Sequence, residues 1–191
     1  MPPPRRFCWA PAVAGCVFAL VLVVSAASAQ GARPAEYQVK AAYLYNFGKF
    51  IDWPPSPAAK EGSVKEEPFS ICVLGRDPFG AILDSTLAGG RINGQGIETR
   101  RIATPHEALN CRIVFIGSSE ENQLKEDLAL LQGTSVLTVS DIAEFSRRGG
   151  MIQFVLQDNK VRFEINLAAT QNAGLMMSSE LLKVASTVRK P

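Results

Sequence analysis

Few side chains in this sequence could carry out chemistry, and none of them form a familiar catalytic arrangement. The 191-residue chain has one histidine, His106, which stands beside Pro105 in a polar stretch. Nucleophilic catalysis pairs a nucleophile with a base, and no free cysteine is expected to remain near this histidine. No group of histidine, cysteine and carboxylate residues has metal-ligand spacing. The sequence therefore predicts a protein that is not an enzyme and that uses no metal or cofactor.

Two turns that contain glycine are possible anion sites. GRDPFG (75–80) follows an apolar run and opens a helix with Asp77 as its N-cap, and Gly117 is followed by Ser118 and Ser119 in a similar place. The first turn lacks the Lys and Ser/Thr of a P-loop, and the second lacks the frame of a hydrolase nucleophile. We interpret both turns as helix caps. Asp77, Ser118 and Ser119 are the ligand-binding residues of an alternative interpretation.

The first 29 residues have the organisation of a secretory signal peptide. Arg5 and Arg6 precede the apolar run VFALVLVV (17–24), which is followed by the small-residue cleavage site Ala27–Ala29. The apolar run is short for a membrane span, which needs about 20 residues. We expect removal of residues 1–29 and export of a single domain formed by residues 30–191.

The mature domain is close to electrically neutral. The chain has 20 Lys+Arg and 18 Asp+Glu, and loss of Arg5 and Arg6 with the signal peptide leaves 18 of each. A nucleic-acid-binding domain normally shows a strong basic excess. We therefore expect no nucleic-acid partner.

Two of the four cysteines, Cys72 and Cys111, belong to the mature domain. In an oxidising compartment a single pair of this kind indicates a disulfide bond. Level placement in adjacent parallel strands would stagger the two Cα atoms by about 10 Å, beyond the limit of about 7 Å for a bridge. A disulfide thus requires the second strand to extend further past the sheet end, or Cys111 to lie in the loop that leads to it.

Alternating strands and helices make up most of the domain. The most prominent element is a helix predicted from Glu36 to Trp53, which ends before Pro54. It has two apolar sectors, which indicates packing on more than one side; one sector could instead meet another chain. Short apolar strands are expected at 69–74, 97–102, 112–116 and 136–139, with helices in between.

The last third of the chain departs from this alternation. Runs at 151–156 and 161–165 flank a polar turn and predict a β-hairpin, and a helix is expected from about 167 to 188. We predict a single α/β domain with a mixed, mostly parallel sheet flanked by helices, a late β-hairpin and a C-terminal helix.

Two late features suit a protein partner. Glu164 is a single charge between two apolar strand residues, and a methionine-rich apolar segment follows. Methionine side chains make adaptable contacts, although they fill cores more often. The candidate partner-binding residues are Glu164, Leu175, Met176, Met177, Leu181 and Leu182.

Three stretches resemble the YfiR family. They are KAAYLYNFGKFIDWP (40–54), CVLGRDPFG (72–80) and GGMIQFVLQDNKVRFEINLAATQNAGL (149–175). The resemblance implies a periplasmic, non-enzymatic, dimeric inhibitor with an α/β sandwich-like fold. Such a protein would bind the periplasmic part of a membrane-bound diguanylate cyclase similar to YfiN, lower cyclic-di-GMP and restrain biofilm formation.

The resemblance also implies a second partner and a disulfide. An outer-membrane lipoprotein similar to YfiB would sequester the inhibitor, and Cys72 and Cys111 fit the family's disulfide. A second cysteine pair that some relatives carry has no counterpart at 145–152. A competing hypothesis is a periplasmic small-molecule-binding sensor domain that acts on another membrane receptor.

Overall fold

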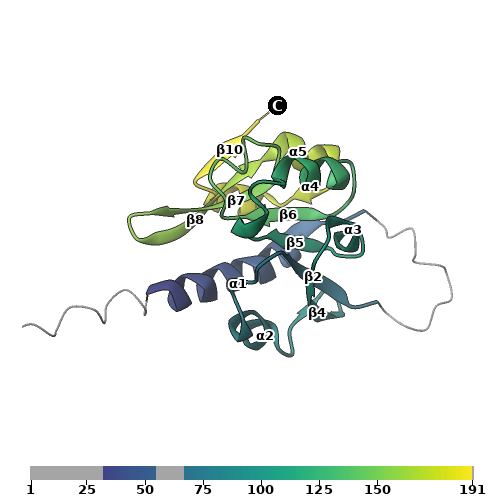
Figure 1. Ribbon diagram of the computed structural model, residues 1–191, viewed down its shortest axis with the longest axis vertical. Coiled ribbons are helices and arrows are strands. Elements are labelled where there is room, and N and C mark those ends of the chain that lie inside the picture. The colour runs from purple at the N-terminus through teal and green to yellow at the C-terminus, as the bar shows by residue number, and fades with distance from the viewer. Residues whose placement is uncertain (1–31, 55–66, 191) are drawn as a thin grey trace, which may run out of the picture.

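Eight strands form the central sheet of the computed structural model, which describes residues 32–54 and 67–190 (Figure 1). The predicted signal peptide, 1–29, lies outside the described residues. The strand order is β10-β8-β7-β6-β5-β2-β4-β3. The sheet strands are β2 (Phe69–Leu74), β3 (Arg91–Ile92), β4 (Gln95–Ile102), β5 (Ile113–Ile116), β6 (Leu137–Ser140), β7 (Ile152–Gln157), β8 (Lys160–Asn166) and β10 (Thr187–Arg189).

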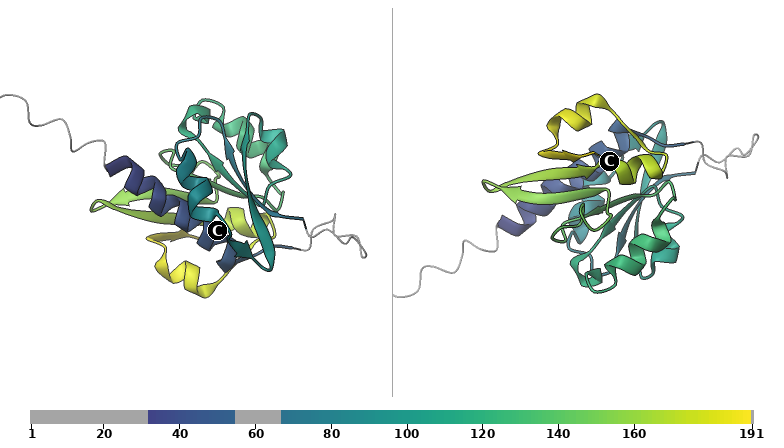
Figure 2. Two further views of the ribbon diagram at one scale, coloured as in Figure 1. Left: turned by 90° about the horizontal axis from the view of Figure 1, so that it is seen from below. Right: turned by 90° about the horizontal axis from the view of Figure 1, so that it is seen from above.

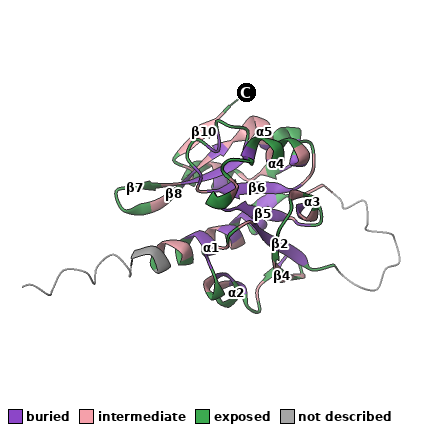
Figure 3. Ribbon diagram, viewed as in Figure 1, coloured by how far each residue is buried: buried purple, intermediate pink, exposed green. Residues whose placement is uncertain are grey.

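Parallel pairing holds the centre of the sheet, and antiparallel pairing occurs toward its edges. β4, β2, β5, β6 and β7 pair in parallel, whereas β8 and β3 pair antiparallel to their neighbours β7 and β4. Every residue of β2, β5 and β6 is buried (Figure 3), because helices cover both faces of these strands. The predicted mixed, mostly parallel sheet with a late hairpin is confirmed.

Helices cover the two faces of the sheet separately. α1 (Ala32–Phe50), α2 (Ala81–Leu87) and α6 (Ser179–Val184) pack on the face that includes Ile71 and Val73. α3 (Pro105–Ala108) and α4 (Leu124–Leu131) pack on the opposite face. The remaining short elements are β1 (Ile51–Asp52), β9 (Met176–Met177), α5 (Leu167–Asn172) and the 3-10 turn η1 (Ser118–Glu120).

The helix predicted for 36–53 ends earlier, at Phe50. Ile51 and Asp52 instead pair antiparallel with β9, and the carbonyl oxygen of Phe50 accepts a hydrogen bond from Ser178 N at 2.9 Å. Helical periodicity alone cannot register this change, because the partner strand lies more than a hundred residues away in the chain.

The helix predicted for 167–188 is also divided. α5 ends before Gly174, whose φ of 70° is not helical, and Leu175 N donates to the carbonyl of Thr170. β9 follows, and Ser178 then caps α6 by accepting a hydrogen bond from Leu181 N. The chain finishes as β10, which adds to the sheet edge parallel to β8.

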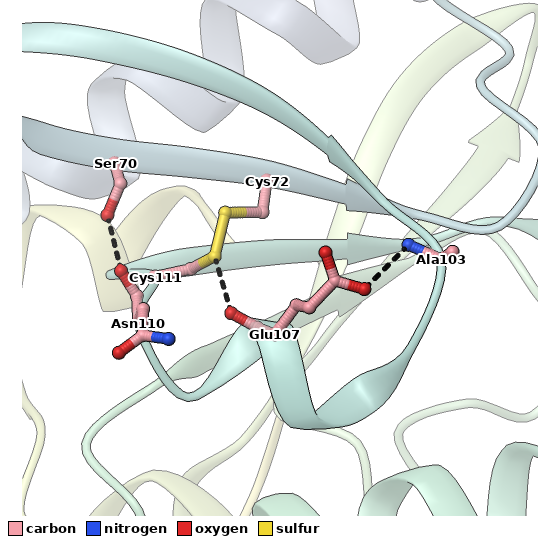
Figure 4. Close-up of a disulfide and its surroundings, with 6 residues drawn as sticks. All are labelled: Ser70, Cys72, Ala103, Glu107, Asn110 and Cys111. Atoms are coloured by element: carbon pink, nitrogen blue, oxygen red, sulfur yellow. Dashed lines mark hydrogen bonds between the residues drawn. A yellow bond between two sulfur atoms is a disulfide. The ribbon is translucent and has the colours of Figure 1, made fainter.

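Cys72 and Cys111 form a disulfide with a Cα–Cα distance of 6.1 Å (Figure 4). Cys72 is paired in register with Val114, so Cys111 lies before β5, in the loop that follows α3. Two hydrogen bonds hold this loop against β2: Arg112 N to the carbonyl of Ser70, and Ser70 Oγ to the carbonyl of Asn110. The disulfide expectation is confirmed, through the second of its two geometric routes.

Loss of this disulfide should lower the free energy of unfolding by about 4 kcal/mol, because the bridge restricts the unfolded chain over a 39-residue separation. The comparison is urea unfolding of the oxidised protein against the Cys72→Ala/Cys111→Ala variant. The wild-type protein with its disulfide reduced is the control, because it loses the bridge without the cavities that the alanine substitutions leave. Equal midpoints for oxidised and reduced protein would contradict the prediction.

Asp127 on α4 has a carboxylate side chain in an apolar environment. Its side chain is buried with Leu124 and Leu131 on the same helix face, and within the described part of the chain its Oδ2 has no hydrogen-bond partner. Burial raises the pKa of Asp127, and the nearby carboxylates of Glu120 and Glu126 raise it further. The charged form therefore opposes folding.

Asp127→Asn should stabilise the protein at pH 7 by about 1 kcal/mol, because an unpaired buried charge is removed. The raised pKa sets the sign of the pH dependence. Wild-type stability should fall as pH rises above the unfolded-state pKa of Asp, near 4, and this part of the decline should be absent in the variant. Glu98→Gln, at an exposed position of β4, is the control, because it also removes one carboxylate charge. An unchanged or lower stability of Asp127→Asn at pH 7 would contradict the prediction.

Candidate partner-binding surface

The residues predicted to bind a partner are divided between the core and the surface. Leu175 and Leu181 are buried, so they can shape the surface only from beneath. Met177 and Leu182 are partly buried and rest on the core. Met176 is the most exposed large apolar side chain in the described structure, at 68 %.

The β1–β9 pair decides which way the two methionines face. Ile51 is opposite Met177 and Asp52 is opposite Met176. Successive side chains of a strand point to opposite faces. The buried Ile51 and the partly buried Met177 therefore face the core, while Asp52 and Met176 face outward.

Exposed apolar side chains lie on the elements next to β9, and the outward-facing Asp52 lies opposite Met176. Phe50, 41 % exposed, stands at the end of α1, where its carbonyl bonds to the residue after β9, and Val184 at the end of α6 is 60 % exposed. α1 and α6 are in contact and lie on one side of the sheet (Figure 2). We call this the α1–β9–α6 surface and define it by Phe50, Met176, Met177, Leu182 and Val184.

Glu164 has partners within the protein. Its Oε2 accepts hydrogen bonds from Arg189 Nη2 at 2.9 Å and from Ser146 Oγ at 3.0 Å. Arg189 Nε also donates to Ser146 Oγ, and Ser146 N donates to Gln153 Oε1. This network ties β10 and the loop before β7 to β8. Glu164 thus holds the C-terminal strand in place.

Lys40 is a second buried charge that the sequence pattern did not single out. Its ammonium group forms ion pairs with Glu36, one turn earlier on α1, and with Asp141 at 2.6 Å. Tyr37 Oη also donates to Asp141. Asp141 follows β6, so these contacts lock the N-terminal half of α1 onto the carboxyl ends of the parallel strands. The sequence did contain a signal for this ion pair, because Lys40 is a charged residue among the apolar residues of the helix.

The side chains of the alternative ligand site serve local structure. Asp77 Oδ1 accepts a hydrogen bond from Phe79 N, and Asp77 Oδ2 accepts one from Arg101 Nε at 2.9 Å. Ser119 Oγ accepts from Arg76 N and so joins the two glycine turns, while Ser118 is exposed in η1.

Arg101 is a strong anchor for the turn that contains Asp77. It pairs with Asp77 and with Asp84 of α2, and its Nη2 donates to the carbonyl of Gly80. The hydrogen bond from Arg101, followed by one from Thr99, lowers the pKa of Asp84. Two carboxylates face one guanidinium in this cluster, so its net negative charge disfavours a bound anion.

The part of the chain that the structure describes contains no cluster of three metal-binding side chains. Among the same residues, no helix combines the length and apolar character that a membrane crossing requires.

A family model matches residues 37–186, a range that leaves out only the first residues of α1 and the whole of β10 among the described helices and strands. The model is described as YfiR/HmsC-like. The chain belongs to this family. Members of the YfiR/HmsC-like family are periplasmic regulators of cyclic-di-GMP signalling, not known catalysts. The resemblance noted in the sequence is therefore confirmed at the level of the family.

Two solved structures are distantly similar. A conserved domain protein from Vibrio cholerae O1 biovar El Tor has 9 % sequence identity and a TM-score of 0.49, with 63 % of this chain and 55 % of that chain covered. The ABC domain in complex with L-Trp from Streptococcus pneumonia has 12 % identity and a TM-score of 0.47, with 62 % and 54 % covered. This chain spans about half the length of each. Neither similarity bears on function.

Arg189→Gln should lower the free energy of unfolding by about 1 kcal/mol and increase amide hydrogen exchange in β10, because the half-buried Glu164 loses a charged partner. Arg147→Gln is the matched control, since Arg147 and Glu144 form a comparably short ion pair, 3.0 Å, that is largely exposed. Equal exchange rates in β10 for the two variants would show that the Glu164 network does not hold this strand.

Proposed function

We propose that this protein binds the periplasmic part of a membrane-bound diguanylate cyclase through the α1–β9–α6 surface and inhibits the cyclase. Inhibition lowers cyclic-di-GMP and restrains biofilm formation. Membership of a family of periplasmic cyclic-di-GMP regulators supports the pathway. The observation that supports the surface is the exposed Met176, which stands among partly exposed apolar side chains of three different elements.

The chemistry of the surface suits a protein partner. Contiguous exposed apolar side chains are uncommon on monomers and often mark interaction sites. The β1–β9 pair and the buried Leu175 and Leu181 hold the surface residues on a fixed backbone, so little ordering is needed on binding. Methionine adapts to an irregular partner surface at small cost.

The same surface accommodates the other proposed partners by competition. A YfiB-like outer-membrane lipoprotein that covers Met176 would release the cyclase, and a homodimer formed elsewhere on the domain would present two copies of the surface. Both are proposals that follow from the family resemblance. Small-molecule sensing with action on another receptor is the alternative. The local hydrogen bonds of Asp77 and Ser119 do not favour a ligand site at the two glycine turns.

Met176→Glu should abolish capture of the cyclase, with at least a tenfold loss of affinity, because a charge would be buried in an apolar contact. The measurement uses the protein exported by its own cell to recover membrane proteins from detergent-solubilised membranes, followed by a cyclase assay with the partner that is recovered. Leu109→Glu is the matched control, because Leu109 is 46 % exposed at the end of α3, on the opposite face of the sheet.

Each result decides a different point. Capture and inhibition by wild type and by Leu109→Glu, with loss in Met176→Glu, support both the function and the surface. Capture that survives Met176→Glu would refute the surface alone. Failure of the wild-type protein to recover any diguanylate cyclase, with cyclic-di-GMP unchanged when the gene is deleted, would refute the proposed function.

A further inference from the structure

A groove lies between α4 and α5, and none of its lining residues belongs to the α1–β9–α6 surface. The two helices are neighbours (Figure 1), and the space between them is a cavity of about 410 Å³ whose floor includes Thr138 of β6 and Met151. Pockets for small ligands span roughly 300–1,000 Å³. The groove therefore has the size of a site for a small organic molecule.

Small residues keep the groove open. Ala129 on α4 faces a wall that contains Ala168 and Ala169 of α5. Gly133, with φ of 72°, ends α4 at one end of the groove, and a Cβ placed on it would meet nothing within 4 Å. The backbone on both sides is fixed, since Asn166 caps α5 by accepting from Ala169 N and its amide also donates to the carbonyl of Ser146. The groove is thus a formed feature between anchored elements.

The charges that line the groove have one sign. Lys125 and Arg148 lie at the end near the start of α4, and no aspartate or glutamate is among the lining residues in the described structure. Lys125 has no carboxylate partner among the described residues. Arg148 donates from Nη2 to the carbonyl oxygen of Glu121, and its Nη1 is 3.6 Å from the Glu121 carboxylate. A guanidinium has five N–H donors, so Arg148 retains donors for an anion.

The rest of the lining is apolar, with amides at the far end. Leu128, Leu131 and Met151 provide the apolar wall between the cationic end and the end formed by Gln132 and Asn172. These last two side chains make no hydrogen bond within the described residues. Fixed cations beside an apolar wall favour an amphipathic ligand, which has an anionic group at one end and an apolar body.

We propose that this groove binds a small organic acid with an apolar body, whose carboxylate pairs with Lys125 and Arg148. The body lies against Leu128 and Met151 between the two helices. The site goes beyond the proposed function, because it shares no residue with the α1–β9–α6 surface. It also shares none with Asp77, Ser118 and Ser119, so it provides a ligand site in a place that the sequence did not indicate.

The test compares two probes that differ in charge alone. The purified exported protein, labelled with ¹⁵N, is titrated at constant ionic strength with 3-phenylpropionate and with its neutral amide, and amide signals are followed by NMR. The signals of Leu128, Gly149 and Ala169 should shift and saturate with the acid, which should bind about tenfold more tightly than the amide. This measurement needs no cyclase, so its failure is distinct from failure of the proposed function.

Three variants locate the interaction. Lys125→Gln combined with Arg148→Gln should remove the preference for the acid, and Ala129→Phe should block both probes by filling the groove. Lys183→Gln is the matched control, because it removes one positive charge from an exposed position on α6. Lys125→Gln alone, at an exposed helix position, should reduce the preference severalfold and serves if the double variant fails to fold.

Four outcomes would overturn the proposal. They are the absence of saturable shifts, equal binding of acid and amide, equal loss of preference in Lys183→Gln, and shifts confined to signals outside the groove. If the groove signals instead shift with protein concentration in the absence of a probe, the occupant is a second copy of the chain and the small-acid site is refuted.

Discussion

The burial of α1 against the late β-hairpin is the contact on which the other features of this protein depend. Phe47 is fully buried between Phe154 of β7 and Phe163 of β8, with ring centroids 5.8 and 5.1 Å away. The Lys40–Asp141 ion pair fixes the other half of the helix over the strand ends. Because α1 cannot shift, the chain leaves it at Phe50 in the direction needed to pair with β9.

That pairing organises the surface that we assign to a protein partner. β9 is only two residues long, so its position depends on pairing with β1 and on the buried residues next to α5 and in α6. Leu175 and Leu181 provide this support from beneath, and Met176 is left outside. A regulator that works by binding needs such a combination of a rigid base and an adaptable apolar face.

Charged groups act in this fold mainly through ion pairs that hold separate elements together. Glu164 with Arg189 holds the last strand, Lys40 with Asp141 holds α1, and Arg101 holds the turn before α2. The disulfide has the same role for the loop before β5. The groove between α4 and α5 is different, because Lys125 and Arg148 line an open space and no aspartate or glutamate is among its described lining residues. This contrast is why we assign a ligand to the groove and not to the glycine turns.

Local pattern was sufficient to predict the α/β class, the parallel centre, the late hairpin, the disulfide pair and the family. These depend on apolar runs, turn residues and spacing, which are properties of short segments. Only the tertiary structure decided the end of α1, the division of the C-terminal helix, the burial of Leu175 and Leu181, and the partner of Glu164. Each of these depends on a contact between distant segments, such as Ile51 with Met177 or Glu164 with Arg189. Such contacts override local propensity, because burial and strand pairing contribute more free energy than the preference of a few residues for a helix.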